Sequence, residues 1–327
     1  MTIRPLFITA ALLAVSLVIG VVVGPAAYSI HELQEALFSG QEGPARTILL
    51  SIRFPRVVAA ALVGASLALS GTIFQAVLRN PLAEPYLLGV QAGAALGAAT
   101  AITFGLTTFG SLTLPLTALV GALLAIGVVF RVARVSEQLD THVLLLAGVV
   151  SSSFFVAVLL LLLTLASTDS LQSAFFWTLG NLGGVSWRMI LVLAAWLIPS
   201  FIVSLAKARD LNALALGEET AASLGTEVES EKHLAYFLAS LLAAAAVSVA
   251  GVIGFIGLVV PHTVRLLWGA DHRMLIPTSF LGGAAVLVLA DAAGRTVASP
   301  LEIPVGVVTA FVGVPFFLAL LRRGYAR

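Results

Sequence analysis

The sequence predicts an all-α, polytopic membrane protein that crosses the bilayer about ten times. Hydrophobic residues make up 60% of the 327 residues and charged residues only 10%, and the mean hydropathy is +1.09. Soluble domains carry roughly 25% charged residues. Within the stretch from Arg53 to Gly97, the 22 residues from Val57 to Leu78 carry no charge, which is enough for a helix to cross about 30 Å of hydrocarbon.

Further charge-poor segments predict the other crossings. We expect helices at 6–27, 57–78, 86–106, 112–130, 143–166, 188–206, 234–253, 255–268, 275–293 and 303–321. The first segment is longer than the apolar core of a cleaved signal, the alternative, and is interpreted as a membrane helix. The uncharged run from Pro85 to Phe130 is divided into two crossings by the polar residues 107–111. Because Pro261 interrupts 255–268, that segment is expected to cross only partly, and nine or eleven crossings also fit.

The positions of lysine and arginine predict the orientation. With ten crossings and a cytoplasmic N-terminus, twelve of the 17 positive residues fall in cytoplasmic segments and five fall outside. Those five are Arg46, Arg53, Arg56, Arg188 and Arg295. Because cytoplasmic segments usually carry the excess of positive residues, we expect both termini in the cytoplasm.

A weak internal repeat is consistent with two inverted halves. The segment 71–81 matches 251–261 in its glycine–proline spacing, with Ile73 opposite Ile253. Five crossings in each half would give the two segments opposite orientations, as in inverted-repeat transporters. Glycine and alanine are frequent throughout the chain, so chance similarity is the alternative.

The chain lacks the sequence features that would power transport or catalysis. It has no cysteine, and neither lysine follows a glycine as in a phosphate-binding GxxxxGK[ST] loop. The helix centres lack the carboxylates that ion-driven carriers use, and His262 is interpreted as a helix-end or packing residue. No metal site or HExxH pattern is found. A transporter of this kind needs energy from another polypeptide; an ion-coupled secondary carrier or a membrane-embedded enzyme is the alternative.

The longest polar loop, residues 207–233, is the expected contact with that polypeptide. Its apolar positions form two short amphipathic runs, at Leu211, Leu214 and Leu216 and then at Ala221, Ala222 and Leu224. Gly217 separates the runs and Gly225 ends the second. Glu218 and Glu219 lie in the first turn of the second run, where the helix dipole favours anions. The alternative is a loop folded back on its own membrane domain.

Ordered blocks along almost the whole chain resemble one transporter family. They are RFPRVVAAALVGASLALSG at 53–71, QAVLRNPLAEPYLLGVQAGAALG at 75–97, VLLLAGV at 143–149, FFWTLGNLGGVSW at 175–187, LNALALGEETAASLG at 211–225, GVIGFIGLVVPHTVRLLWGADHR at 251–273 and LEIPVGVVTAFVGVPFFLALL at 301–321. The chain resembles the FecCD-type permeases, the membrane subunits of ABC importers for iron–siderophore complexes, haem and vitamin B12.

The resemblance implies a fold similar to the vitamin B12 permease, with ten helices in a single permease domain, 1–327. It also implies a homodimer in the inner (cytoplasmic) membrane that moves its cargo inward by alternating access. The implied partners are two cytoplasmic ATPase subunits, a periplasmic or lipid-anchored substrate-binding protein, and membrane lipid, with no nucleic acid. The chain would bind no cofactor and would be no enzyme, because ATP and Mg²⁺ belong to the ATPases.

Matching positions carry the family's functional roles as expectations. The outer arginines that pair with glutamates of the binding protein correspond to Arg53, Arg56 and Arg295. The cytoplasmic gate corresponds to Asn80, Leu82, Asp140 and Thr141. At the gate this chain has Asp-Thr-His at 140–142, whereas the vitamin B12 permease has a Thr-Ser-Arg type sequence. The ATPase-coupling helices correspond to Leu216, Gly217, Glu218, Ala221, Leu224 and Gly225.

Two of these expectations have alternatives in the residues themselves. Arg53 and Arg56, three apart at a helix start, can face the same way, but arginine stems also lie along apolar surface with the head in water. For the cargo, a pathway lined by residues 151–155 (Ser-Ser-Ser-Phe-Phe) suits a bulky, partly apolar molecule. An iron chelate is favoured, with haem or a corrinoid next and a small oxyanion last.

Overall fold

The computed structural model describes residues 3–25, 31–32, 34–35, 43–135 and 138–325. Its α-helices are α1 (Arg4–Val22), α3 (Pro44–Thr47), α4 (Phe54–Val77), α5 (Val90–Thr103), α6 (Thr113–Ala133), α7 (Thr141–Thr164), α8 (Thr168–Thr178), α9 (Trp187–Ala206), α10 (Ala208–Leu216), α11 (Glu218–Ser223), α12 (Val228–Ala250), α13 (Ile256–Trp268), α14 (His272–Thr296) and α15 (Val305–Tyr325). Shorter turns are the π-helix η1 (Ile48–Arg53) and the 3₁₀ helices η2 (Pro85–Leu88) and η3 (Gly110–Leu112). The strands β1 (Arg134–Val135) and β2 (Gln138–Leu139) form an antiparallel hairpin with Arg134 opposite Leu139.

The described helices confirm the predicted all-α membrane fold. Seven of them are long and apolar enough to cross a membrane, and three shorter apolar helices cover 90–103, 256–268 and 305–319. Taken in chain order, these helices follow the ten predicted crossings. Residues 26 and 27, the end of the first predicted crossing, lie outside the described residues.

The main departures from the predicted boundaries occur where the chain leaves helical geometry. Helix α5 begins at Val90 rather than at residue 86, because η2 precedes it and Gly89 takes a left-handed conformation with φ of 75°. Helix α13 begins after a non-helical segment, 251–254, and a left-handed Phe255 with φ of 68°. The segment 71–81 is helical up to Val77, whereas 251–254 is non-helical. The two segments matched by sequence therefore differ in conformation.

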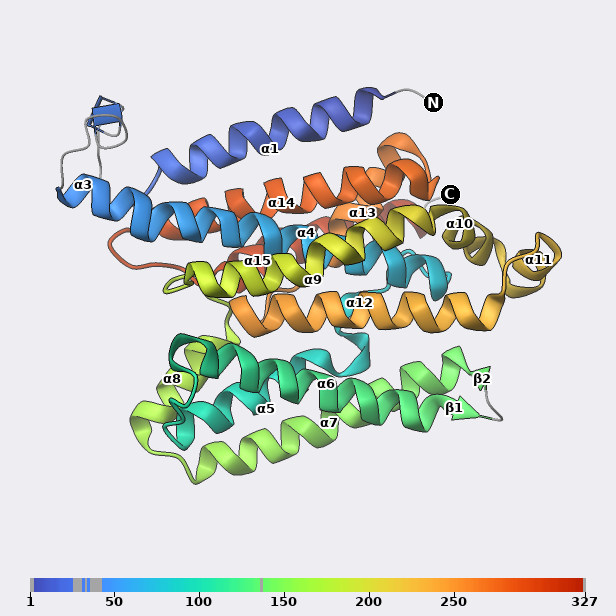
Figure 1. Ribbon diagram of the computed structural model, residues 1–327, viewed down its shortest axis with the longest axis horizontal. Coiled ribbons are helices and arrows are strands. Elements are labelled where there is room, and N and C mark those ends of the chain that lie inside the picture. The colour runs from blue at the N-terminus through green and yellow to red at the C-terminus, as the bar shows by residue number, and fades with distance from the viewer. Residues whose placement is uncertain (1–2, 26–30, 33, 36–42, 136–137, 326–327) are drawn as a thin grey trace.

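The helices form two neighbouring groups (Figure 1). Helices α1, α4, α9, α12, α13, α14 and α15 lie in the upper group of the view, and α5 to α8 lie below them. Helix α4 is buried along nearly its whole length. One end of the molecule carries the hairpin, α10, α11, the start of α1 and the end of α15, and we call it the hairpin end. The other end, with α3 and α8, is called the arginine end for the cluster described below.

Small residues let α4 pack against its neighbours with almost no space between the backbones. A β-carbon on Gly64 would collide with the carbonyl of Gly283 in α14, and one on Gly71 would collide with the carbonyl of Gly257 in α13. Such close approach is how helices associate in lipid, where burial of apolar surface gives little driving force. The small residues of the central stretch therefore have the packing role that the sequence indicates.

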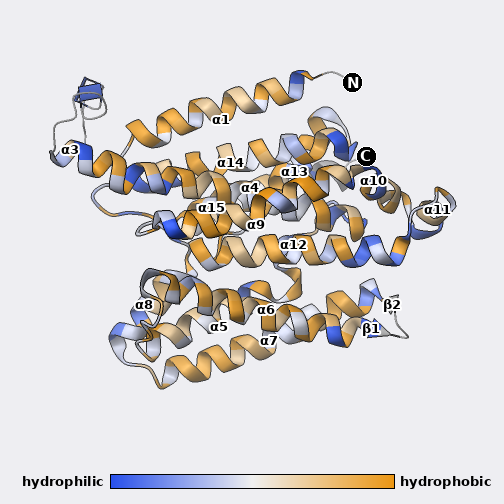
Figure 2. Cartoon of the chain, viewed as in Figure 1, coloured by the Kyte–Doolittle hydropathy of each residue, from blue (hydrophilic) through white to orange (hydrophobic). Residues whose placement is uncertain are grey.

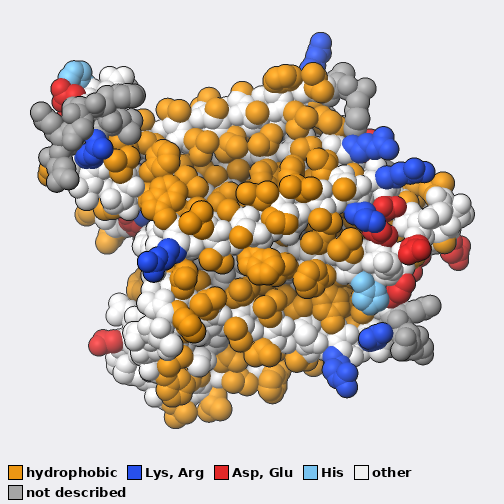
Figure 3. All heavy atoms as spheres, in the orientation of Figure 1, with side chains coloured by type: hydrophobic (Ala, Val, Ile, Leu, Met, Phe, Trp, Pro, Cys, Tyr) orange, Lys and Arg blue, Asp and Glu red, His pale blue; other side chains and the backbone are white. Residues whose placement is uncertain are grey.

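Polar and apolar residues are separated along the length of the helices. The long helices are hydrophobic over most of their length, and hydrophilic residues gather at the hairpin end (Figure 2). The visible surface is apolar across its middle, with many of the charged side chains at that end (Figure 3). Large apolar residues such as Leu160, Leu191 and Ile202 are more than half exposed. An apolar surface of this extent suits contact with lipid or another chain.

The packing of α4 predicts that Gly71→Val destabilises the fold, because the added side chain has no space beside Gly257. Overpacking of this kind typically costs about 1–3 kcal/mol. Thermal unfolding of the purified chain in detergent measures the loss. Gly127→Val in α6 is the matched control, since no atom lies within 4 Å of the position its β-carbon would take. Equal melting temperatures for the two variants would contradict the packing argument.

Candidate functional site

An ion-pair cluster occupies the arginine end, where α4 begins and α14 ends. Arg56 Nε donates to Asp291 Oδ1 at 2.9 Å, and Arg56 Nη1 donates to Glu302 Oε2 at 2.8 Å. Arg295 Nε lies 2.9 Å from Asp291 Oδ2. Asp291 is only 1% exposed, so its charge is compensated entirely by neighbouring arginines. A buried carboxylate requires such partners.

Arg295 of this cluster and the neighbouring Arg53 also hold the end of α1. Arg53 Nη1 donates to the carbonyl oxygens of Val21 at 3.1 Å and Val22 at 2.9 Å. Arg295 Nη2 donates to the carbonyl oxygen of Gly20 at 3.0 Å. The last carbonyls of a helix have no intrahelical partner and carry partial negative charge, which favours cations. The two guanidinium groups therefore satisfy the C-terminus of α1.

The three arginines predicted to dock a binding protein lie together but are not equally accessible. Arg53 and Arg295 are 3% and 2% exposed and bond within the chain. Their heads rest on backbone carbonyls, which also differs from snorkelling into water. The Arg56 side chain is 11% exposed, and that of its partner Glu302 is 43% exposed. Of the three, Arg56 is therefore the one that another protein could reach in this arrangement.

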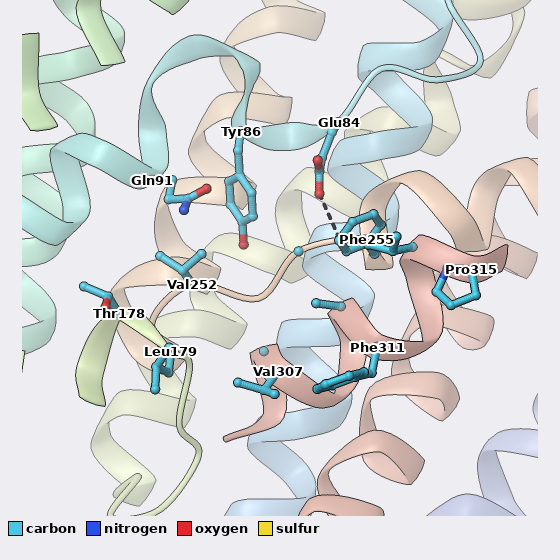
Figure 4. A pocket seen from close by; sticks show the side chains of 14 residues that line it. Glu84, Tyr86, Gln91, Thr178, Leu179, Val252, Phe255, Val307, Phe311 and Pro315 are labelled. Carbon is cyan, nitrogen blue, oxygen red and sulfur yellow. Dashed lines mark hydrogen bonds between the residues drawn. The ribbon is translucent and has the colours of Figure 1, made fainter. Parts of the chain in front are cut away.

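A cavity of about 670 Å³ lies where the chain is non-helical between α12 and α13 (Figure 4). Its walls come from η2, α5, the end of α8, the segment 252–255 and α15. The lining is mostly apolar, with Val252, Phe255 and Phe311 among its members, and Glu84 and Gln91 add polar atoms. The cavity thus combines apolar walls with a few polar groups, as small-molecule sites do.

Glu84 and Tyr86 hold this non-helical segment in place. Glu84 Oε1 accepts from the backbone N–H of Phe255 at 2.8 Å. The Tyr86 hydroxyl donates to the carbonyl of Ile253 at 2.8 Å and accepts from its N–H at 3.3 Å. Neither Glu84 nor Tyr86 is given a role by the sequence patterns. The signal that could have found them is their place in a proline-bounded break between two apolar runs.

The segment 151–155, proposed from sequence to line a pathway, lies on α7 and is absent from the lining of this cavity. Ser151 and Phe155 are buried within the chain. Phe154 is 64% exposed and Ser153 is exposed as well. Alternate faces of this segment therefore point into the helix group and out of it.

The residues predicted to form a gate lie at the hairpin end in two turns. Asn80 Oδ1 accepts from the N–H of Leu82 at 2.9 Å, which fixes the turn after α4. Asp140 caps α7 by accepting from the N–H groups of Val143 at 2.9 Å and His142 at 2.8 Å. These bonds, with that from Val143 foremost, lower the pKa of Asp140. The cap is therefore present at neutral pH and is lost only as the pH falls through that lowered pKa.

Thr141, the other residue of this turn, contacts α12. Its hydroxyl lies 3.2 Å from the hydroxyl of Tyr236, a fully buried side chain. The Tyr236 ring packs against Phe74 of α4 and Phe130 of α6, with ring centroids 6.3 and 6.4 Å apart. The start of α7 is thus attached to the interior of the molecule.

The predicted pair of short helices is present at 208–223, as α10 and α11. Gly217 between them has φ of 119°, and Gly225 after them has φ of 85°, conformations that favour glycine. Ala221 is fully buried, whereas Leu216 and Leu224 are 69% and 57% exposed. The helix pair therefore packs inward by one face and presents two leucines outward.

The chain matches one family of known proteins over nearly its whole length. The model of the FecCD transport family matches residues 12–323. This chain belongs to the FecCD transport family. A FecCD protein is the transmembrane permease subunit of an ABC importer and not an enzyme. The family implies ATPase subunits and a substrate-binding protein as partners.

Curated relatives of this FecCD permease agree in length and type. It is 43% identical to the cobalamin import system permease BtuC of Halobacterium salinarum, over 85% of this chain and 74% of the relative. It is 42% identical to the hemin transport system permease HmuU of Yersinia pestis, over 84% and 83%. It is 39% identical to the ABC transporter permease YvrB of Bacillus subtilis, over 95% and 91%.

Solved structures agree with the fold. An inward-facing conformation of an ABC transporter described as of the metal-chelate type matches with a TM-score of 0.84 and 32% identity, over 98% of both chains. PsaBC from Streptococcus pneumoniae matches with a TM-score of 0.60 and 19% identity, over 89% of this chain and 95% of the other. The second likeness concerns the fold alone.

The ion-pair cluster predicts that Asp291→Asn strongly destabilises the permease. The change would leave Arg56 and Arg295 without their shared buried partner, and breaking a buried pair typically costs about 3–5 kcal/mol. Glu302→Gln removes a surface partner worth about 0–1 kcal/mol and serves as the control. Thermal unfolding in detergent compares the two variants. A loss for Asp291→Asn no larger than that for Glu302→Gln would show that the cluster adds little to stability.

Proposed function

We propose that this permease imports a bulky chelate, namely an iron–siderophore complex, haem or a corrinoid, as one half of a homodimer. The observation that carries the proposal is the cavity of about 670 Å³ at the break between α12 and α13. Its apolar walls suit the body of such a cargo, and Glu84 and Gln91 suit its polar edge. Two copies facing each other would enclose a larger pathway between their cavities.

The relatives support this class of cargo. Similar permeases are named for cobalamin and for hemin, and a similar solved transporter is described as of the metal-chelate type. Cobalamin, hemin and metal chelates are all large, partly apolar molecules that hold a metal. A siderophore complex is the preferred cargo among them, and a small oxyanion would leave most of the cavity unfilled.

The hairpin end is proposed to face the cytoplasm of a cell with the permease in its inner membrane. Twelve of the 17 positive residues fall on that side when ten crossings are assumed, in line with the usual bias. Both termini would then be cytoplasmic. The exposed Leu216 and Leu224 would contact the ATPase subunits, and Gly217, Glu218, Ala221 and Gly225 would shape the helix pair that carries them. ATP and Mg²⁺ would bind to those subunits alone.

The turns at 80–82 and 140–141 are proposed as the cytoplasmic gate. Asn80 and Asp140 each fix a turn by a side-chain bond to the backbone, and Leu82 and Thr141 lie within those turns. Both turns lie at the hairpin end, beside α10 and α11. Movement of the helix pair could therefore open or close the exit of the pathway.

Uptake into proteoliposomes tests the cargo. The permease is reconstituted with the ATPase and binding protein from its own gene cluster, and ferric ferrichrome, haemin and cyanocobalamin are offered in turn. We expect ATP-dependent uptake of at least one of them, and no ATP hydrolysis by the permease alone. Uptake of none of the three, by vesicles whose ATPase responds to the binding protein, would refute this class of cargo.

Docking of the binding protein is proposed at the arginine end, with Arg56 as the contact and Arg53 and Arg295 as its support. A carboxylate of the binding protein would compete with Glu302 for Arg56. At physiological salt, the electrostatic attraction between these charges would be screened beyond about 8 Å. The salt dependence of binding should therefore reveal it.

Paired variants test docking at Arg56. Arg56→Gln should weaken binding of the isolated binding protein by up to about fivefold, the range of a surface ion pair, and should reduce its salt dependence. Glu302→Gln, which removes the internal competitor, should leave binding unchanged or tighter. Surface plasmon resonance on nanodiscs at low and high salt measures both. Identical affinities and salt slopes for the two variants would remove Arg56 from the docking surface.

A further inference from the structure

A further buried cation, Lys232 in the first turns of α12, lies at the hairpin end. The residue is 4% exposed. Its Nζ donates to the carbonyl oxygen of Leu139 at 3.0 Å and lies 3.2 Å from Glu218 Oε1 and 3.5 Å from Glu229 Oε2. A lysine ammonium has three donors and no acceptor. One hydrogen bond and two ion pairs therefore surround the ammonium group of Lys232.

Lys232 and Glu229 together hold both backbone polar groups of Leu139. Glu229 Oε1 accepts from the N–H of Leu139 at 2.6 Å, and Lys232 donates to its carbonyl. The two side chains are three residues apart and so share one face of α12. Leu139 ends strand β2 and directly precedes Asp140 and Thr141. Helix α12 thus fixes the chain immediately before the proposed gate.

The same face of α12 continues this contact into the gate. Tyr236 lies one turn beyond Lys232 and meets the hydroxyl of Thr141. Glu229, Lys232 and Tyr236 therefore contact two residues of a single short segment, 139–141, which we call the gate segment. A displacement of this part of α12 and a displacement of the gate segment would have to occur together.

Lys232 also reaches the helix pair proposed to bind the ATPase. Glu218 is the first residue of α11, so one ammonium group contacts α11 and the gate segment at once. The neighbouring Gly217 lies beside the other gate turn, because its β-carbon position would be 3.7 Å from Arg79 Nη1. Arg79 directly precedes Asn80. The junction of α10 and α11 thus lies close to both proposed gate turns.

We propose that Lys232 is a positioning residue that transmits movement of α11 to the gate segment. The inference rests on the proposed function and names the connection inside it: Glu218 on the ATPase side, Lys232 in the middle and Leu139 on the gate side. Withdrawing Glu218 or Leu139 from this buried ammonium would weaken the compensation of its charge. The three groups therefore move as a unit when an ATPase displaces α11.

Spin labels on the complete importer in nanodiscs can follow both ends of this link. The chain has no cysteine, so Thr220→Cys in α11 and His142→Cys at the start of α7, both exposed positions, can be labelled one at a time. The distance between the two copies is measured without nucleotide and after trapping with MgATP and vanadate. In the wild type we expect both distances to change.

Two changes should break the link. In Lys232→Met and in Glu218→Gln the Thr220 distance should still change, while the change at His142 should be lost. Cargo moved per ATP should fall at least about fivefold, the lower end of typical coupling between sites. The double variant should be no worse than Lys232→Met alone, because that change already removes the contact with Glu218. Lys232→Arg keeps the charge and should retain the change at His142.

Glu219→Gln is the matched control, since Glu219 is the exposed neighbour of Glu218; it should retain the change at His142. If Lys232→Met fails to assemble, Glu218→Gln decides, because the Glu218 side chain is 41% exposed and its change is expected to leave the fold intact. A normal change at His142 with normal cargo per ATP in Glu218→Gln overturns the proposal. So does loss of both distance changes in that variant, which would mean a direct contact with the ATPase.

The same experiment separates this inference from the proposed function. The label distances need ATP but no cargo, so they report the link whatever the importer carries. A wild-type His142 distance that is equal in both states overturns the link. Failure of the wild type to take up ferric ferrichrome, haemin or cyanocobalamin would instead refute the proposed cargo.

Discussion

Where the chain leaves a helix among apolar helices, its backbone N–H and C=O groups must find partners inside the protein. This constraint shapes the permease. The chain leaves helical geometry between α4 and α5 and between α12 and α13. Gln75 donates to the carbonyl of Ala83 in the first break and to that of Gly257 in the first turn of α13. Glu84 and Tyr86 add bonds to the segment 253–255. Because these side chains satisfy the breaks, α5 and α13 can start as short helices, and the cavity forms beside their first turns.

Most of the fold could be predicted from the sequence, because a membrane helix appears there as an uninterrupted apolar run. The helix pair at 208–223 could also be predicted, from apolar spacing and from glycines where the backbone turns. The boundaries of α5 and α13 could not, since they depend on φ at Gly89 and Phe255. Phe255 is a residue whose left-handed conformation no local pattern indicates. There the bond from Phe255 N–H to Glu84, 171 residues away, accompanies the local conformation.

The candidate site could be predicted in composition but only partly in arrangement. The sequence shows that Arg53, Arg56 and Arg295 are unusual outer charges. It does not show that they bind Asp291 and the end of α1. Equally, Lys232 looks like one more residue of a polar loop. Its burial depends on Leu139, 93 residues away along the chain. Long-range partners of this kind decide whether a charge faces a binding protein, a neighbouring helix or a backbone carbonyl.

The attachment of α1 has a consequence for biosynthesis. Helix α1 leaves the ribosome before the other described helices, yet one of the guanidinium groups that holds its end belongs to Arg295, 272 residues after the carbonyl of Val23 that it binds. At a synthesis rate of about 5–20 residues per second, that partner emerges roughly 14 to 54 s later. During this interval the end carbonyls of α1 have to be satisfied by water, lipid headgroups or the insertion machinery. Helix α1, the earliest of the described helices, is therefore among the last to be fastened in place.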